Sequence, residues 1–212
     1  MKLSAGIERY IEGHIDPQDD ILAELERETS LNVINPRMLS GHMQGSMLTM
    51  FSKMMRPASV LEIGTYTGYS AICLAKGLQP GGKLITIEMN DELEPLARKY
   101  FTRAGLSGII DMRIGNALEI IPGLNGPFDL VFMDADKRQY PEYYNLVIDK
   151  VVSGGWIIAD NILWDGKVAG NADPGDMQTR GILEFNAMVA ADNRVEKTIV
   201  PVRDGIMVVR KR

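Results

Sequence analysis

The part of this sequence that says most about its fold is Leu61-Glu62-Ile63-Gly64-Thr65-Tyr66-Thr67-Gly68-Tyr69-Ser70. An apolar run leads into two glycines four residues apart, and a helical pattern begins directly after them. Glycine permits a tight turn in which a ligand can approach the backbone closely. The arrangement is typical of the loop that follows the first strand of a nucleotide-binding α/β sheet.

The loop departs from the dinucleotide-binding pattern G-x-G-x-x-G. Tyr66 fills the place of the second glycine, where a pyrophosphate needs the space. Ser70, at the start of the following helix, can offer a hydroxyl to a ligand. Taken alone, the loop is also compatible with a glycine turn that binds nothing.

Short apolar runs alternate with amphipathic stretches after Pro57. This alternation predicts an α/β fold, a parallel sheet with helices on both faces. The expected strands are Ser59–Ile63, Lys83–Glu88, Ile109–Ile114, Phe128–Asp134 and Trp156–Asp160, and the expected helices between them are Tyr69–Leu78, Asp91–Ala104, Ala117–Ile121 and Pro141–Val152.

The end of the chain has a different pattern. After a helix predicted over Met177–Ala191, the β-like runs Val195–Val202 and Ile206–Arg210 flank Arg203-Asp204-Gly205. Asp-Gly between two such runs predicts a hairpin. The sheet should therefore finish with an antiparallel edge.

Residues 1–56 are predicted to be helical. Ile7, Ile11 and Ile15 recur every four residues, the spacing of one helix stripe, and Asp16-Pro17 ends it. The methionines of the last helix are expected to pack in the core. Two further helices are expected, over Asp19–Thr29 and Met43–Met55.

Length and composition fit a single domain over residues 1–212, with an N-terminal helical segment (1–56) and a sheet (57–212). Hydrophobic residues make up 45% of the chain, which excludes disorder as the overall state. The 23 Lys and Arg against 28 Asp and Glu give a net charge of −5, whereas a protein that coats nucleic acid is usually basic. Residues 1–30 account for this charge, because the remainder is balanced.

Several absences indicate a cytoplasmic protein. Cys73 is the only cysteine, so an internal disulfide or a thiolate metal cluster is excluded. Met1-Lys2-Leu3-Ser4 leads into charged residues, so no secretory signal is expected. No uncharged apolar stretch approaches the roughly 20 residues that span a membrane.

Oxygen-bearing side chains end three of the expected strands. Glu88 lies 88 − 64 = 24 residues beyond Gly64, and an acid about 20 residues on can bind a ribose diol. Asp134 ends the fourth strand, and Asp160-Asn161 end the fifth. Two carboxylates and an amide carbonyl suit Mg²⁺, and also Mn²⁺ or Ca²⁺, better than zinc. The simpler alternatives are a solvated strand-end acid at Glu88 and helix-capping aspartates.

Lys137 lies three residues beyond Asp134, within reach of the same pocket. An ordinary lysine is protonated and a poor base at neutral pH. Beside a divalent cation and partly removed from water, its neutral form gains population. It can then accept a proton from a metal-bound hydroxyl; the alternative is a solvated lysine.

With these residues in place, the chain resembles the class I S-adenosylmethionine (SAM)-dependent methyltransferases. More narrowly, it resembles the cation-dependent O-methyltransferases, the group of catechol O-methyltransferase and caffeoyl-CoA O-methyltransferase. The similarity extends from about Asn35 to Arg212. It is carried by five motifs in the family's order: Leu61–Ser70, Ile85–Glu88, Val131–Tyr140, Ile158–Val168 and Thr179–Asn186.

The resemblance implies a Rossmann-like methyltransferase fold with a seven-stranded, mostly parallel sheet, an antiparallel C-terminal hairpin and extra N-terminal helices. It also implies SAM as cofactor. Glu88 matches the family's ribose acid and Ala117 its adenine contact. Asp134 and Asp136 match further cofactor contacts. The positions that match those holding the methionine part of SAM are Ser40, Glu62, Gly64, Thr65 and Ser70.

The resemblance likewise implies the chemistry. Asp134, Asp160 and Asn161 match the metal ligands, Lys137 the catalytic lysine, and Trp164 an aromatic residue that lines the acceptor pocket. A vicinal-diol aromatic can chelate Mg²⁺, which lowers the pKa of a phenolic hydroxyl. Lys137 takes the proton, and the phenolate attacks the sulfonium methyl group in line.

Two features bear on the acceptor and the assembly. Plant caffeoyl-CoA enzymes carry tyrosines before the helix that matches the one containing Thr179. The stretch Ala172–Thr179 of this chain has none. A smaller, catechol-like acceptor is therefore expected in place of a CoA ester. The family is commonly dimeric, so a homodimer is expected.

Other functions remain open. Some bacterial members of the group methylate a hydroxylated wobble uridine in tRNA, which needs basic patches. A dinucleotide-dependent oxidoreductase is opposed by Tyr66 and by the strand-end oxygen donors. A partner protein without catalysis is opposed by the complete set of expected ligands. The residues that can supply basic patches are Arg37, Lys53, Arg56 and Arg210-Lys211-Arg212.

Overall fold

The computed structural model describes residues 4–170, 173 and 175–212. The first three residues of Met1-Lys2-Leu3-Ser4, where no secretory signal is expected, lie outside this described part. The strands form a seven-stranded sheet in the order β3-β2-β1-β4-β5-β7-β6. This confirms the predicted fold class. The chain divides into two compact units, described separately below. Of the described residues, those within 60–64 and 116–212 form the first unit, and those within 4–59 and 65–115 form the second.

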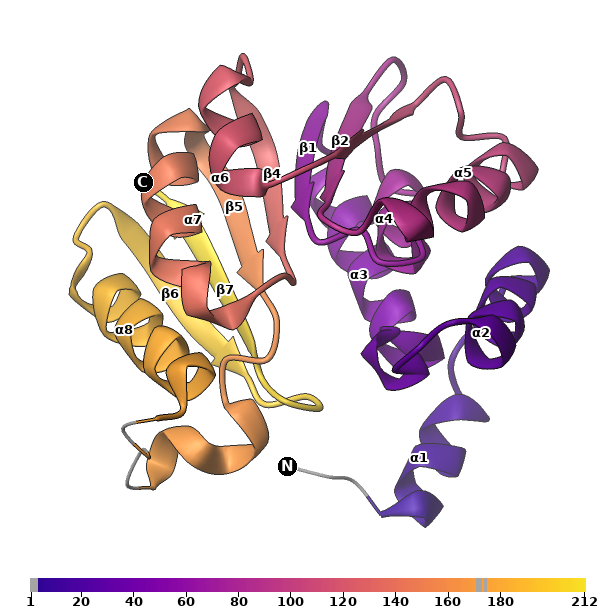
Figure 1. Ribbon diagram of the computed structural model, residues 1–212, viewed down its shortest axis with the longest axis horizontal. Helices are drawn as coiled ribbons and strands as arrows, with labels where there is room; N and C mark the ends of the chain where they lie inside the picture. Colours follow the sequence, from indigo (N-terminus) through magenta and orange to yellow (C-terminus); the bar gives the residue numbers. More distant parts are fainter. Residues whose placement is uncertain (1–3, 171–172, 174) are drawn as a thin grey trace. The chain divides into compact units, whose positions relative to one another are not determined.

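The strands of the first unit combine parallel and antiparallel pairing (Figure 1). Strands β1, β4 and β5 are parallel, β7 pairs antiparallel with β5, and β6 pairs antiparallel with β7. The predicted hairpin and antiparallel edge are therefore confirmed. The bounds are β1 (Ser59–Ile63), β4 (Phe128–Met133), β5 (Val151–Ala159), β6 (Val195–Val200) and β7 (Ile206–Lys211).

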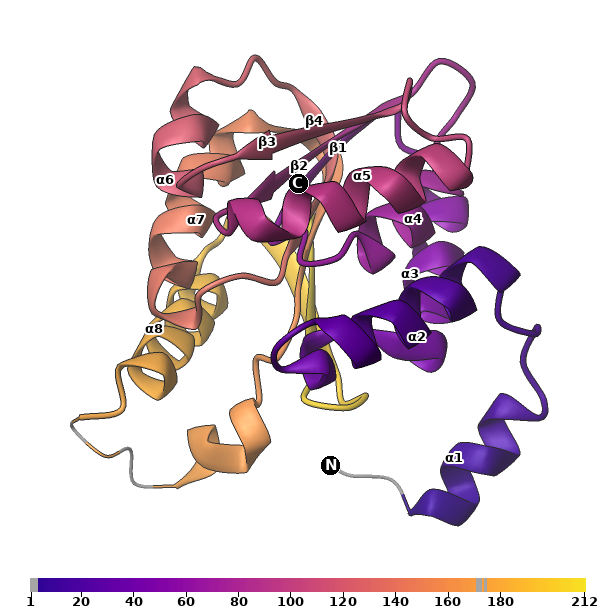
Figure 2. The same ribbon diagram turned by 45° about the vertical axis from the view of Figure 1, so that its right-hand side comes forward.

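Helices α7 and α8 of this unit lie side by side (Figure 2). The rings of Tyr140 and Tyr144 on α7 meet Phe185 of α8 edge-on, with centroids 5.4 and 5.9 Å apart. Such aromatic pairs add about 0.5–1.5 kcal/mol beyond burial. The bounds are α6 (Ala117–Ile120), η3 (Ile121–Gly123), η4 (Lys137–Gln139), α7 (Tyr140–Val147), η5 (Ile148–Lys150), η6 (Trp164–Ala169) and α8 (Met177–Ala191).

The predicted boundary between the helix over 141–152 and the next strand was wrong. Strand β5 begins at Val151, which pairs with Phe128 of β4. Val151 and Val152 are β-branched and favour the pleated sheet. The helix therefore ends at Val147, and the strand begins five residues before the predicted start at Trp156.

The second unit pairs two parallel strands with helices. Strand β2 (Lys83–Glu88) runs beside β3 (Ile110–Ile114), with Glu88 opposite Ile114, and α5 lies alongside them (Figure 2). None of the described helices of the chain is long and apolar enough to cross a membrane. The helices are α1 (Ala5–Glu12), α2 (Asp20–Asn32), η1 (Pro36–Met38), α3 (Gly41–Met55), α4 (Tyr69–Ala75), η2 (Asp91–Leu93) and α5 (Glu94–Arg103).

The first helix is shorter than its isoleucine stripe predicted. Helix α1 ends at Glu12, where Gly13 donates its backbone N–H to Arg9, so Ile15 lies beyond the helix. Glycine is a poor helix residue and a common end point. No side chain of α1 is buried.

The methionines of α3 do not form its buried face as predicted. Met54 is 74% exposed. A Cβ on Gly45 would lie 2.5 Å from the ring of Tyr69 on α4, so the two helices approach too closely for long side chains at the contact. The buried residues of α3 are instead Gln44, Gly45, Leu48 and Ser52.

Candidate functional site

The first unit places Asp134 and Asp160 at the same edge of its sheet. Strands β4 and β5 are parallel and pair Met133 with Ala159, and each aspartate directly follows its strand. The backbone N–H of Asp160 donates to the carbonyl oxygen of Met133 at 3.0 Å. The predicted neighbourhood of the two carboxylates is therefore present.

Asn161 directly follows Asp160 and carries an amide. Its φ of 61° is left-handed, a conformation that asparagine adopts more readily than most residues. Its backbone N–H donates to Oδ1 of the buried Asp160 at 2.8 Å. Within the described part of the chain, no hydrogen bond to the Asn161 side-chain amide is found. That amide oxygen is available as a third ligand.

The donor set fits a hard divalent cation. Two carboxylates and an amide oxygen are the ligands that Mg²⁺, Mn²⁺ and Ca²⁺ accept. Among residues 4–170, 173 and 175–212, no group of three or more His, Cys, Asp or Glu is arranged to hold a metal. A zinc site of that composition is therefore not found in the described residues.

Lys137 is buried beside these carboxylates and is not the solvated lysine of the alternative reading. Its side chain is 7% exposed, and Nζ donates to Asp134 Oδ1 at 2.7 Å. A second N–H of Nζ donates to the Tyr140 hydroxyl at 2.8 Å. The turn η4, capped by Asp136, places the lysine there.

Tyr140 is a site residue to which the sequence analysis gave no role. It is fully buried, and its hydroxyl lies 3.1 Å from the carbonyl oxygen of Met133 and 3.0 Å from that of Asp160. Burial raises the pKa of Tyr140 well above its ordinary value, and the charges of Asp134 and Asp160 raise it further. The hydroxyl therefore stays protonated. The only signal in the sequence is its position three residues after Lys137, which puts both on one side of a helical turn.

Gly181 of α8 is a second residue that the sequence analysis missed. A Cβ there would lie 2.3 Å from the carbonyl oxygen of Lys137 and 2.7 Å from Cα of Arg138. Glycine inside a helix costs about 0.5–1 kcal/mol relative to alanine. Its signal is a glycine within a helical pattern, which often marks a packing contact.

Gly64, directly after β1, packs closely against the backbone of Asp134. Its φ is +99°, and a Cβ would lie 2.1 Å from the carbonyl oxygen of Asp134. The backbone N–H of Asp134 donates to Ile63 at 2.9 Å. The packing of the strands therefore requires a glycine at position 64, whether or not a ligand binds there. Glu62, in the same strand, is fully buried.

In the second unit, Glu88 is held by the loop that follows β1. Its Oε2 accepts from the backbone N–H of Tyr66 at 2.7 Å, and Oε1 accepts from that of Asn90 at 2.9 Å. Each carboxylate oxygen has two lone pairs, so both can still accept from a ribose diol. Glu88 is therefore an ordered acceptor and not a freely solvated strand end.

The other expected cofactor residues of this unit are buried. Thr65 Oγ1 lies 2.5 Å from Thr86 Oγ1, so its side chain is already engaged. Ser70 lies in the first turn of α4, and Ser40 precedes α3. A Cβ on Gly68 (φ +92°) would lie 2.6 Å from a neighbouring ring, which explains this glycine without a ligand.

Three remaining predicted residues lie in the first unit. Ala117 opens α6 after its Asn116 cap and is buried. Asp136 pairs with Arg138, whose guanidinium lowers the pKa of the carboxyl. Trp164 is half-buried in η6 with a left-handed φ of 46°. Their cofactor and acceptor roles stay predictions.

The loop that carries Trp164 is tied to the C-terminal hairpin. The backbone N–H of Ile162 donates to Gly205 at 3.1 Å, and that of Leu163 donates to Asp204 at 2.9 Å. The hairpin therefore supports the segment expected to shape the acceptor pocket. Residues 171, 172 and 174 of that segment lie outside the described residues.

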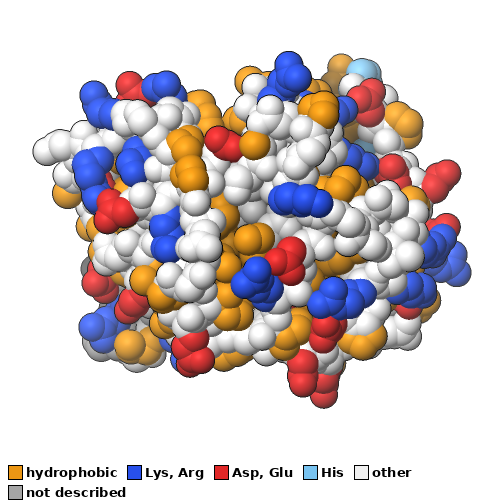
Figure 3. Space-filling model, turned by 90° about the horizontal axis from the view of Figure 1, so that it is seen from above, with side chains coloured by type: hydrophobic (Ala, Val, Ile, Leu, Met, Phe, Trp, Pro, Cys, Tyr) orange, Lys and Arg blue, Asp and Glu red, His pale blue; other side chains and the backbone are white. Residues whose placement is uncertain are grey.

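Arg210 and Lys211 of the basic C-terminal run lie in β7. Arg210 pairs with Glu196 at 3.1 Å, and Lys211 Nζ donates to the carbonyl oxygens of Ile148 and Val151 at 2.8 Å. On the face drawn in Figure 3, Lys and Arg side chains are interspersed with acidic, apolar and uncharged ones. Arg210 and Lys211 therefore have structural partners that would compete with phosphates.

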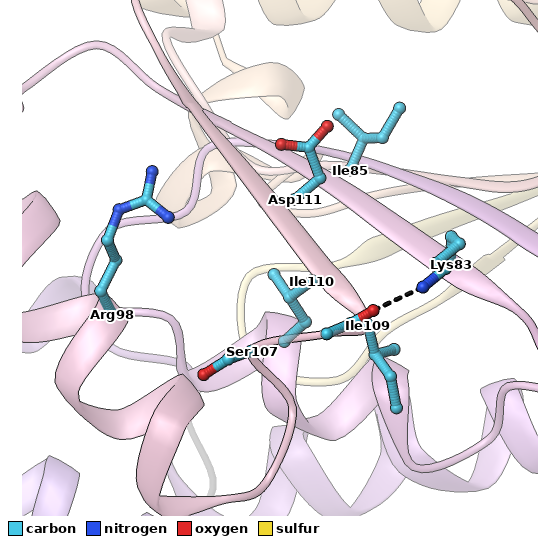
Figure 4. Close-up of a pocket in the computed structure, with 8 residues that line it drawn as sticks. Lys83, Ile85, Arg98, Ser107, Ile109, Ile110 and Asp111 are labelled. Carbon is cyan, nitrogen blue, oxygen red and sulfur yellow. Dashed lines mark hydrogen bonds between the residues drawn. The ribbon is translucent and has the colours of Figure 1, made fainter.

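A separate hollow of about 480 Å³ in the second unit contains none of the predicted site residues (Figure 4). Lys83 in its wall donates to the carbonyl oxygen of Gly108 at 2.5 Å. Arg98 donates to Glu94 and to the carbonyl oxygen of Met112. Both cations are engaged, so the hollow does not compete with the strand ends as a functional site.

Comparisons with known proteins point to one family. Residues 12–212 match the family model described as O-methyltransferase. The chain is 35% identical to a catechol O-methyltransferase of Niastella koreensis (92% of this chain, 89% of the relative). It is 39% identical to a caffeoyl-CoA O-methyltransferase of Mesembryanthemum crystallinum (79% of this chain, 70% of the relative). Its structure is similar to that of the O-methyltransferase from Bacillus cereus in complex with SAH, with a TM-score of 0.89, 31% identity and 97% of each chain covered.

Proposed function

The chain belongs to the O-methyltransferase family, and on this premise we propose that it methylates one hydroxyl of a small catechol-like molecule. The methyl donor is SAM, and a divalent cation, in first place Mg²⁺, is required. The observation that carries the proposal is the meeting of Asp134, Asp160 and the buried Lys137 at one edge of the sheet.

SAM as donor is supported by the relatives. The Bacillus cereus enzyme holds SAH, the product that SAM becomes on losing its methyl group. SAM supplies a sulfonium methyl group that an oxygen nucleophile can take. In this chain, Glu88 would accept from the ribose hydroxyls and Ala117 would contact the adenine. The methionine part would lie against Ser40, Glu62, Gly64, Thr65 and Ser70, with Asp134 and Asp136 as further contacts.

The cation would be held by Asp134, Asp160 and Asn161, whose oxygen donors suit it. When bound, it supplies a positive charge that lowers the pKa of a coordinated hydroxyl. Lys137, held 2.7 Å from Asp134 Oδ1, lies where it can take the hydroxyl proton. The remaining task of the protein is orientation of the two reactants.

The group transfer balances as follows. The acceptor O–H bond would break, and its proton would pass to a lone pair on Nζ of Lys137. An oxygen electron pair would form the O–CH₃ bond as the S–CH₃ bond of SAM breaks, and the rest of SAM would leave as a neutral thioether. Water later removes the proton from Lys137.

A catechol-like acceptor is supported by a relative that matches 92% of this chain, a catechol O-methyltransferase. Trp164, half-buried in η6, is the proposed aromatic wall of the acceptor pocket. The test is methyl transfer from labelled SAM to catechol and to phenol, which lacks the second hydroxyl. We expect transfer to catechol at least 100-fold faster. Equal rates would show that a vicinal diol is not needed.

A homodimer is proposed from exposed apolar side chains of the second unit. Leu31, Ile34 and Met54 are 73%, 85% and 74% exposed, and α1 buries none of its side chains. Large exposed apolar residues often mark interaction sites. Light scattering across a dilution series checks the assembly, and a mass of one chain at micromolar concentration would contradict it. A cytoplasmic location stays a prediction.

A further inference from the structure

Two hydrogen-bond acceptors hold the amine of Lys137. Nζ lies 2.7 Å from Asp134 Oδ1 and 2.8 Å from Tyr140 Oη. The nitrogen is tetrahedral, and one of its four directions is the bond to Cε. The two acceptors take two more, so a single direction remains for a substrate hydroxyl.

The direction of the hydrogen bond between Lys137 and Tyr140 is fixed by their neighbours. The Tyr140 hydroxyl lies 3.0 and 3.1 Å from the carbonyl oxygens of Asp160 and Met133. Carbonyl oxygens only accept, so the tyrosine hydrogen points to them. The lone pairs of Oη are then directed at Nζ, and Lys137 is the donor.

The ring of Tyr140 is itself held firmly. It is fully buried, meets Phe185 edge-on at 5.4 Å and lies 4.8 Å from Nζ of Lys137. A lysine side chain is flexible, and two fixed acceptors confine its amine. The fixed ring of Tyr140 therefore holds the amine of Lys137 in place relative to the edge of the sheet.

We propose that Tyr140 is a positioning residue that directs the one free site of the Lys137 nitrogen toward the acceptor hydroxyl. The inference rests on the proposed function in placing Lys137 against the acceptor hydroxyl. Tyr140 itself does not touch the substrate. Without its hydroxyl, the amine keeps one acceptor and can rotate away from the reactive direction.

The test compares Tyr140→Phe with Tyr144→Phe. Both variants remove one hydroxyl from a buried ring of α7 that packs on Phe185, but the Tyr144 hydroxyl bonds to Asp192 and not to Lys137. We expect kcat for catechol to fall about tenfold in Tyr140→Phe, because the variant lacks one of the two hydrogen bonds that hold the amine. The KM for SAM should be unchanged in both variants, and kcat should be unchanged in Tyr144→Phe.

A measurement without activity separates this inference from the proposed function. In a crystal structure of Tyr140→Phe, Nζ of Lys137 should occupy more than one position, whereas Tyr144→Phe should keep one. A single Nζ position within hydrogen-bond distance of Asp134 in Tyr140→Phe would overturn the inference, even if wild type proves inactive on catechols. Equal loss of kcat in the two variants would overturn it as well.

A second variant covers the case in which Tyr140→Phe does not fold. Phe185→Leu leaves both hydroxyl partners of Tyr140 in place but removes the ring that holds it edge-on. We expect a smaller fall in kcat, about two- to fivefold, with an unchanged KM for SAM. An unchanged kcat would contradict the role of the ring.

Discussion

Gly64 and Asp134 are packed so closely that a Cβ on the glycine would lie 2.1 Å from the aspartate carbonyl oxygen. The first residue belongs to the loop expected to bind SAM, and the second is an expected metal ligand. One steric contact therefore connects the end of β1 with the end of β4, where the proposed chemistry takes place.

Gly64→Ala should consequently be strongly destabilising. The alanine would combine a left-handed φ of +99° with a backbone clash, so a loss of about 3 kcal/mol or more is expected. Gly81→Ala is the matched control, because Gly81 has φ +81° but nothing within 4 Å of its Cβ. It should cost only about 1–2 kcal/mol. Urea unfolding measures both, and equal losses would show that the contact with Asp134 is unimportant.

Gly181→Ala should lower both stability and activity, because its Cβ would meet backbone atoms of Lys137 and Arg138. Alanine improves helix propensity by about 1 kcal/mol, but its Cβ would push on the carbonyl oxygen of Lys137. We expect kcat to fall at least tenfold through displacement of Lys137. Gly6→Ala in α1, where the nearest atom is 3.9 Å away, should leave kcat unchanged. Wild-type kcat in Gly181→Ala would exclude this displacement.

Asp192 should contribute stability that depends on pH. Hydrogen bonds from Arg194 and Tyr144 hold its pKa below the ordinary value, despite an opposing effect of burial. A depressed folded-state pKa adds stability above the unfolded pKa of about 4, and this stability is lost as the pH falls through the folded value. Asp192→Asn should therefore be less stable than wild type at pH 7, with a difference that shrinks below about pH 4.

The control for Asp192 is Asp149→Asn. Asp149 also pairs with Arg194, at 3.2 Å, but its side chain is 81% exposed. Exposed pairs contribute about 0–1 kcal/mol, so little change is expected. Thermal unfolding from pH 3 to 7 decides the matter, and a pH-independent effect of Asp192→Asn would contradict the account.

Asp160→Ala should abolish methyl transfer while SAM still binds. Asp160 is 3% exposed and is a proposed ligand of the cation, whereas none of the proposed SAM contacts involves it. Calorimetry should give a Kd for SAM within about threefold of wild type, a change below 1 kcal/mol. Asp149→Ala should retain full transfer. Loss of SAM binding in Asp160→Ala would indicate a structural effect of the substitution.

The strands and the order of the strand-end residues could be predicted because they follow from local patterns. Apolar runs located the sheet, and parallel strands put Asp134 and Asp160 at one edge. Asp204-Gly205 likewise predicted the hairpin from turn chemistry alone. These features depend on a few neighbouring residues.

Tertiary contacts explain what could not be predicted. The buried face of α3 depends on how closely Gly45 meets Tyr69, which no helical period reveals. The sequence pattern indicates only that Tyr140 is an aromatic residue of a helix. The structure shows that its hydroxyl lies between Lys137 and two carbonyl oxygens. Gly64 was expected to serve a ligand, yet the contact with Asp134 already requires it.

The most direct test of the central claim is methyl transfer to catechol after metal removal. Wild-type protein is treated with EDTA, desalted, and assayed with SAM and catechol before and after addition of Mg²⁺. Asp134, Asp160 and Asn161 are proposed to hold the cation, so we expect activity to fall below 1% and to return with Mg²⁺, since a bound cation supplies several kcal/mol to the reaction. Full activity in EDTA would contradict the account.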